Sequence, residues 1–316
     1  MRASFILRKE RTFGDKVEAT FEFIRLTKKP LFKSMLFYSG PFVLVGTFLV
    51  ANIFNTYFAT QLNAYQGLGM SESDYNEILF SALGILFILL FAITMVIAVV
   101  YSTTKLYEDY EHGDFSHKEV WKRAAKMYWP IFGAVFLYGV IYLILYFILM
   151  VPLSLIVQQE PLLVFPILYL FTAFFSVVAL ISMASQILDN KGLGNGMSQA
   201  FRLLKDNWWI TVGLLVVFGL IYNSVRFVFV IPMYANLLIQ NIIFIRDPLE
   251  EASIVQVALN YVFGGILLLG VFFSYIIPLV GMNLQFFSMS ESKDAKALIN
   301  RIDNLGAEQE EEEEDY

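Results

Sequence analysis

The chain has 316 residues, of which 58% are hydrophobic and 16% are charged, and its formal net charge is −6. Soluble domains carry about 25% charged residues, so this composition excludes an ordinary soluble protein and indicates a polytopic membrane protein. The sequence contains no cysteine, which excludes disulfide bonds and thiolate metal ligands.

Four basic segments alternate with the long apolar stretches of the sequence. Nine Lys and Arg residues lie in residues 2–33, five in 105–126, three in 191–205 and three in 293–301. Basic residues beside transmembrane helices are retained on the cytoplasmic side. We therefore expect both termini in the cytoplasm and an even number of membrane crossings.

Six apolar stretches are long enough to cross a bilayer, which takes about 20 helical residues. They lie near residues 32–57, 77–103, 129–156, 162–188, 208–232 and 254–289. Transmembrane β-strands alternate in polarity, whereas these stretches are continuously apolar, so the predicted fold class is all-α with six transmembrane helices. We expect one transmembrane domain over residues 1–290, followed by a cytoplasmic amphipathic segment and a disordered acidic tail over residues 291–316.

Three cytoplasmic segments share one pattern, in which Gly is followed by Asp or Asn, an amphipathic stretch, and aromatic or proline residues at the membrane entrance. The segments occupy residues 14–30, 113–130 and 194–209. Their similar lengths indicate an internal repeat. We predict three copies of an interfacial amphipathic helix and a transmembrane hairpin, at about residues 12–103, 113–188 and 194–289.

Each amphipathic stretch has apolar residues at helical spacing, which predicts a short helix that lies in the headgroup region. The expected apolar faces comprise Val17, Phe21 and Ile24 in the first stretch, Val120, Trp121, Ala124 and Tyr128 in the second, and Met197, Ala200, Phe201, Leu204 and Trp208 in the third. Thr12 with Asp15, and Ser116 with Glu119, have the spacing of a capping box, in which two side chains satisfy free backbone N–H groups reciprocally.

The stretches FGDKVEATFEFIRLTKKPLFKSML and GNGMSQAFRLLKDNWWITVGLLVVFGLI resemble the recurrent elements of bacterial six-helix proteins related to the membrane domain of glycerophosphodiester phosphodiesterase. The resemblance covers roughly residues 12–290. In the phosphodiesterase a separate soluble barrel domain performs catalysis, whereas only the acidic tail follows the last apolar stretch here. The resemblance therefore implies a membrane module of the bacterial cytoplasmic membrane without the enzyme.

Ligand-type side chains gather in one predicted loop, YEDYEHGDFSHKE, which contains Glu108, Asp109, Glu111, His112, Asp114 and His117. The two histidines are not spaced i, i+4, so they do not share one helix face as a metal-binding pair would. We interpret the loop as solvated and predict no metal site, no cofactor and no catalytic residue. Some relatives carry a carotene-oxygenase label, but that chemistry needs an iron held by four histidines, and this sequence has 2 His.

The interiors of the six stretches contain no Asp or Glu, and their only base is Arg226. Ionisable groups inside a span usually mark a transport path, so ion-coupled transport is disfavoured. Arg226 lies about 27 Å along its helix from Trp208. It is expected to snorkel to the outer interface or to bind a lipid phosphate or a carboxylate such as Glu160. Asn223, Ser224 and Asn260 are expected to form hydrogen bonds between helices.

Two further stretches of the sequence have more than one interpretation. Residues 233–245, after Pro232, are apolar but interrupted by Asn, which fits an interfacial or a re-entrant segment. Residues 295–305 have one apolar face before a run of acids, which is typical of a partner-binding segment or of a short helix before a solubilising tail.

Together these patterns predict a non-enzymatic integral membrane protein that acts as a scaffold or assembly partner. The alternative is handling of lipids or small molecules without ion coupling. The expected partners are membrane lipids and a protein bound through the cytoplasmic face or the acidic tail, and nucleic acid is not expected. The residues predicted to contact lipid or a partner are Arg226, Lys28, Lys29, Lys122, Arg123, Arg202 and Lys205.

Overall fold

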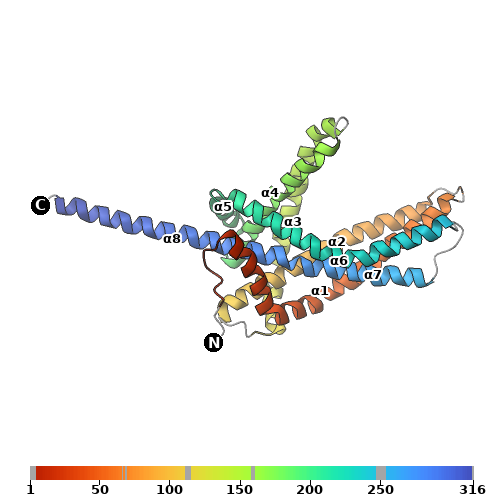
Figure 1. Ribbon diagram of the computed structural model, residues 1–316, viewed down its shortest axis with the longest axis horizontal. Coiled ribbons are helices and arrows are strands. Elements are labelled where there is room, and N and C mark those ends of the chain that lie inside the picture. Colours follow the sequence, from red (N-terminus) through yellow and green to blue (C-terminus); the bar gives the residue numbers. More distant parts are fainter. Residues whose placement is uncertain are drawn as a thin grey trace. The chain divides into compact units, whose positions relative to one another are not determined.

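The computed structural model describes residues 5–65, 67, 70–110, 115–157, 161–246 and 254–314. These residues form eight helices and no strand (Figure 1), so the all-α prediction is confirmed for the part of the chain that is described. The helices are α1 Phe13–Tyr65, α2 Glu72–Tyr110, α3 His117–Val157, α4 Pro161–Leu188, α5 Leu193–Leu204, α6 Trp208–Arg246, α7 Ile254–Ser274 and α8 Ile276–Glu314.

Six segments of these helices are long and apolar enough to cross a membrane, which is the predicted number. They are Phe13–Gln61, Glu72–Tyr110, His117–Ser154, Val164–Leu188, Trp208–Ile242 and Ile254–Ala295. The 53 residues of α1 extend for about 80 Å, whereas the hydrocarbon core is about 30 Å thick. One helix therefore contains both the first amphipathic stretch and the first apolar span.

The three amphipathic stretches join their spans in two different ways. The first and the second continue into their spans without a break, in α1 and α3. The third is the separate helix α5, and a turn at residues 205–207 separates it from α6. Only the third stretch is thus a short helix of its own.

Reciprocal side-chain caps start three of the helices. At α1, the N–H of Thr12 donates to Oδ2 of Asp15 at 3.2 Å, and the N–H of Asp15 donates to Oγ1 of Thr12 at 3.4 Å. Equivalent pairs precede α2 and α3, formed by Ser71 with Asp74 and by Ser116 with Glu119. The capping boxes predicted for α1 and α3 are confirmed, and the one at α2 was not predicted.

The chain forms two compact units. Unit 1 comprises Met1–Leu26, Tyr142–Phe218 and Leu279–Tyr316, and unit 2 comprises Thr27–Ile141 and Gly219–Pro278. Helices α1, α3, α6 and α8 contribute residues to both units. The single domain expected over residues 1–290 with a separate tail stays a prediction.

The helices of unit 2 approach one another closely at glycines. A Cβ atom added at Gly270 of α7 would lie 2.2 Å from the Cβ atom of Phe229 in α6. A Cβ atom added at Gly84 of α2 would lie 2.9 Å from Cδ1 of Leu49 in α1. Small residues that let two backbones approach are typical of transmembrane helix interfaces.

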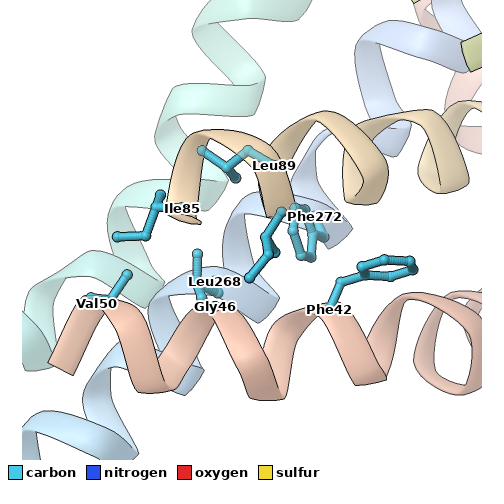
Figure 2. A pocket seen from close by; sticks show the side chains of 8 residues that line it. Phe42, Gly46, Val50, Ile85, Leu89, Leu268 and Phe272 are labelled. Carbon is cyan, nitrogen blue, oxygen red and sulfur yellow. The ribbon is translucent and has the colours of Figure 1, made fainter. Parts of the chain in front are cut away.

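A small apolar void remains between α1, α2 and α7. Figure 2 shows Phe42 and Gly46 of α1 lining it together with Leu89 of α2 and with Leu268 and Phe272 of α7. Its volume is about 10 Å³, which is no more than a single water needs. We interpret it as a packing gap and not as a ligand site.

Two stretches, at the ends of α6 and α8, are more helical than the sequence suggests. Residues 233–245 continue α6 as far as Arg246, so the re-entrant interpretation is wrong. Pro232 lies inside this helix, and neighbouring groups can compensate for a proline there. In the same way α8 continues to Glu314 through the predicted disordered tail, because Glu, Gln and Ala favour helices.

Candidate functional site

The predicted ligand-rich loop provides no metal centre within the described residues, which contain no group of three or more His, Asp or Glu suited to hold a metal ion. Glu111, His112 and Asp114 lie outside the described residues. Asp109 forms an ion pair with Arg123 at 2.5 Å, and the ring of His117 stacks on Phe37 with the centroids 5.9 Å apart. These side chains therefore make structural contacts.

A polar cavity of about 200 Å³ lies in unit 1, between the N-terminal segment, the start of α6 and α8. Its charged lining residues are Glu10, Arg11 and Lys16. A water molecule occupies about 30 Å³ of the liquid, and pockets for drug-sized ligands measure about 300–1,000 Å³. The cavity thus has room for a small polar group but not for a whole lipid.

Asp189, directly after α4, holds the N-terminal segment in place. Its carboxylate forms an ion pair with Arg8 at 3.2 Å and lies 3.9 Å from the ammonium of Lys191. It also accepts a hydrogen bond from Nε2 of Gln199 at 3.1 Å. The guanidinium of Arg8 lies over the ring of Phe287, 4.8 Å from its centroid. Residues that follow α4 or belong to α5 and α8 thereby fix the segment that leads to the cavity.

Two serines of α8 bind the residues just before α1. The backbone N–H of Arg11 donates to Oγ of Ser288 at 3.0 Å. The hydroxyl of Ser292 donates to Oε1 of Glu10 at 2.9 Å. Glu10 is therefore held by the wall of the cavity, and Ser288 keeps its own hydroxyl proton available for another acceptor.

The side chain of Arg11 is occupied by the backbone of its own segment. Its guanidinium donates to the carbonyl of Leu7 at 2.9 Å and to that of Lys9 at 3.3 Å, and also to the carbonyl of Ile6. Desolvation lowers the pKa of Arg11, and the nearby carboxylates of Glu22 and Asp15 oppose this effect. Arg11 thus contributes positive charge to the cavity, although its guanidinium already donates hydrogen bonds to three backbone carbonyls.

Lys16 is the least exposed charged residue of the lining, with 6% of its surface accessible. Its ammonium group makes no hydrogen bond and no ion pair with any residue that the structure describes. A buried charge without a partner is costly. Glu10, in the same lining, favours the charge of Lys16 through space, but no described carboxylate forms an ion pair with its ammonium.

Two helices also begin at this cavity. Thr12 precedes α1, and Asn207 precedes α6, where its carbonyl accepts bonds from the N–H and the Oγ1 of Thr211 at 2.9 and 2.8 Å. The N-terminus of a helix carries a partial positive charge and free N–H groups. Because Asp15 already caps the start of α1, the start of α6 and Lys16 are the groups that favour the same kind of ligand, an anion.

The sequence did not single out Lys16, because the predicted apolar face of this stretch is not the one that packs. Lys16, Ala19, Thr20 and Phe23 form the buried face of α1, whereas Phe21 is 43% exposed. The small side chains of Ala19 and Thr20 allow close packing, which a count of large apolar residues overlooks. Their i, i+3, i+4 spacing from Lys16 is the signal that would have found the site.

The predicted contact residues lie elsewhere, and none of them lines the cavity. Lys28, Lys29 and Lys122 in unit 2, and Arg202 and Lys205 in unit 1, are exposed. Arg123 is paired as described above, and the carbonyl of Arg202 accepts a bond from Lys293. Contacts of these residues with lipid or a partner stay predictions.

Arg226 lies half-buried in unit 2. Its guanidinium carbon is 5.7 Å from the ring centroid of Tyr222, one turn earlier in α6. Its Nε atom is buried and has no hydrogen-bond partner among the described residues. Glu160, the carboxylate suggested as its partner, lies outside those residues.

Asn260 of α7 forms the centre of an interhelical polar cluster, as predicted. Its Nδ2 donates to Oδ1 of Asn55 in α1 at 2.7 Å. Its Oδ1 accepts bonds from Asn236 at 2.6 Å and from Gln240 at 3.0 Å, both in α6. The cluster joins three helices of unit 2 and uses both polar atoms of the Asn260 amide.

The same prediction is wrong for Asn223 and Ser224. Nδ2 of Asn223 donates to the carbonyl of Gly219 at 2.8 Å, and the hydroxyl of Ser224 donates to that of Leu220 at 2.9 Å. Both bonds stay within α6. Because both side chains are exposed, a carbonyl of their own helix is the nearest acceptor.

No family model matches the chain, and neither does any curated protein or solved structure. The resemblance to the membrane domain of the phosphodiesterase therefore stays a prediction.

Proposed function

We propose that the chain is a multi-pass protein of the bacterial cytoplasmic membrane that handles membrane lipids and has no catalytic role. The six apolar helical segments support the membrane location. The basic segments favour cytoplasmic termini. The observation that carries lipid handling is the polar cavity next to the N-terminal basic segment, where the first long helix begins.

The lining of the cavity has the mixed character that a lipid headgroup region requires. Charged Arg11 and Lys16 lie beside Phe13 and Ile210, which are 42% and 46% exposed. Ligand sites for amphiphiles combine apolar walls with a few convergent polar groups. The span interiors contain no carboxylate to carry a coupling ion, so the proposed handling is passive.

The three-repeat organisation and the kinship with the phosphodiesterase membrane domain belong to the same proposal. The capping boxes of Thr12 and Ser116 support the repeat, because they occupy equivalent positions in the first two copies. The third copy differs, since α5 follows Gly192 without a side-chain cap.

A scaffold is the second candidate, and α8 favours it. This helix continues from Ala295, where the last apolar segment ends, to Glu314, a distance of about 28 Å. By its sequence it carries an apolar face and then a run of acids. Such an extension is suited to a partner with a basic, partly apolar surface.

Purification in mild detergent separates the two candidates. The tagged full chain and a variant without residues 291–316 are isolated from the native membrane, and mass spectrometry identifies the proteins and lipids that accompany them. Lipid handling predicts one enriched anionic lipid in both samples. A protein partner that disappears with the deletion would support the scaffold instead, and a chain with neither companion would contradict both proposals.

The orientation is tested with single cysteines, because the chain has none of its own. Met70, before α2, is 49% exposed, and Lys118, in the first turn of α3, is exposed as well. A membrane-impermeant maleimide is expected to label Met70→Cys in intact cells and Lys118→Cys only after permeabilisation. The opposite pattern would reverse the proposed topology.

A further inference from the structure

We propose that the cavity at the start of α1 is a phosphate-binding site in which the ammonium group of Lys16 binds the anion. The inference rests on the proposed lipid handling and names the chemical group that the site recognises. The ligand is a phosphate-bearing anion of headgroup size.

The first argument is the state of Lys16 itself. It is 94% buried and lines the cavity beside Glu10, which acts on its charge through space, and its ammonium forms no hydrogen bond or ion pair with a described residue. Lysine in such a position either loses its proton or binds an anion. The cavity provides the room for that anion.

The second argument is the use of the other charged groups. Glu10 is bonded by Ser292, and the guanidinium of Arg11 is bonded by three backbone carbonyls. Two bases and one acid leave the lining with a net positive charge. An anion that enters the cavity is thus attracted by Lys16 and Arg11 and repelled by Glu10, the one acid of the lining.

The third argument concerns the neutral donors. The hydroxyl of Ser288 accepts from Arg11 and can donate its own proton to the ligand. The start of α6, after Asn207, borders the same space, whereas the carboxylate of Asp15 already caps the start of α1. Phosphate groups are commonly bound at helix N-termini, where the free N–H groups and the helix dipole act together.

The apolar part of the lining favours a lipid as the source of the phosphate. The exposed rings and methyl groups of Phe13 and Ile210 lie beside the charged groups, where the glycerol and the first acyl carbons of an amphiphile would pack. A soluble phosphate monoester would use only the charged part. The two sources therefore differ in what the apolar side adds to affinity.

Binding is measured on the full chain in detergent, from the ligand-induced rise in unfolding temperature over a concentration series. The probes are dihexanoyl phosphatidic acid, dihexanoyl phosphatidylcholine and glycerol 3-phosphate. Lys16→Met removes the positive charge at nearly constant side-chain length, and Lys16→Arg retains a positive charge. Lys9→Met is the matched control, because Lys9 is exposed in the same segment and does not line the cavity.

We expect Lys16→Met to weaken phosphatidic acid binding by about tenfold or more, as the loss of a charged hydrogen bond implies. Lys16→Arg should recover most of the affinity, and Lys9→Met should change it by less than about twofold. Without ligand, Lys16→Met should unfold at a higher temperature than the wild type, because an unpartnered charge has been removed. This second measurement separates a binding defect from a folding defect.

The probes identify the source, and the variants test the site. Phosphatidic acid binding well above glycerol 3-phosphate indicates a lipid, and equal binding of the two indicates a soluble phosphate. Equal affinity of Lys16→Met and the wild type for phosphatidic acid would overturn the inference, while an enriched lipid in the co-purification would still support lipid handling. If the wild type binds no probe and no lipid co-purifies, the proposed function fails as well.

Discussion

The close approach of α6 and α7 allows a sharp prediction for Gly270→Ala. The new Cβ atom would lie 2.2 Å from the Cβ atom of Phe229, whereas ordinary contact begins at 3.4 Å, so the two backbones must separate by 1.2 Å. Overpacking of this kind costs about 1–3 kcal/mol, and the better helix propensity of Ala offsets about 1 kcal/mol of it. We expect Gly270→Ala to lower the unfolding temperature by about 2–4 °C for each kcal/mol that remains.

The assay is thermal unfolding of the purified chain in detergent, with Gly264→Ala as the control. Gly264 lies in the same helix, and its added Cβ atom would meet Val50 at 3.5 Å, an ordinary contact. Phe229→Ala should not rescue Gly270→Ala, because alanine keeps the clashing Cβ atom, whereas Phe229→Gly should remove most of the penalty. Equal unfolding temperatures for Gly270→Ala and Gly264→Ala would refute the reasoning.

Three further predictions concern packing, the polar cluster and a helix cap. Gly281→Ala places its Cβ atom 2.3 Å from Cε2 of Phe218 and should lower the unfolding temperature. Because the clash is with the far end of a ring, the additional substitution Phe218→Leu should restore that temperature. Asn260→Leu breaks three interhelical hydrogen bonds and should destabilise the chain by about 2 kcal/mol, since such bonds contribute about 0.6 kcal/mol each. The control is Asn241→Leu, which should change the unfolding midpoint little, because the amide of Asn241 bonds within its own helix. Ser116→Ala removes a cap worth about 1 kcal/mol, so hydrogen exchange should quicken in the first turn of α3, and unchanged protection there would contradict the role of the capping box.

Local patterns in the sequence were sufficient to predict the helices and some of the positions at which they begin. The apolar stretches predicted six spans because a single helix satisfies its own backbone hydrogen bonds in lipid, whatever its neighbours are. The capping boxes of Thr12 and Ser116 were predictable for a similar reason, since both partners of each box lie within one turn. The run of acids predicts disorder, whereas α8 continues to Glu314, because glutamate favours helices.

The packing of the helices determined the cavity and the polar cluster, because packing joins residues that are far apart in the sequence. The sequence alone determined that Lys16 stands near the capped start of an amphipathic helix. Only the tertiary structure placed it in a cavity with Asn207 and Ser288, where no described group binds its ammonium. Likewise the sequence marked Asn260 as a polar residue in a span, and the packing of α1, α6 and α7 selected Asn55, Asn236 and Gln240 as its partners. Burial depends on which helix faces meet, and helical periodicity within one segment does not contain that information.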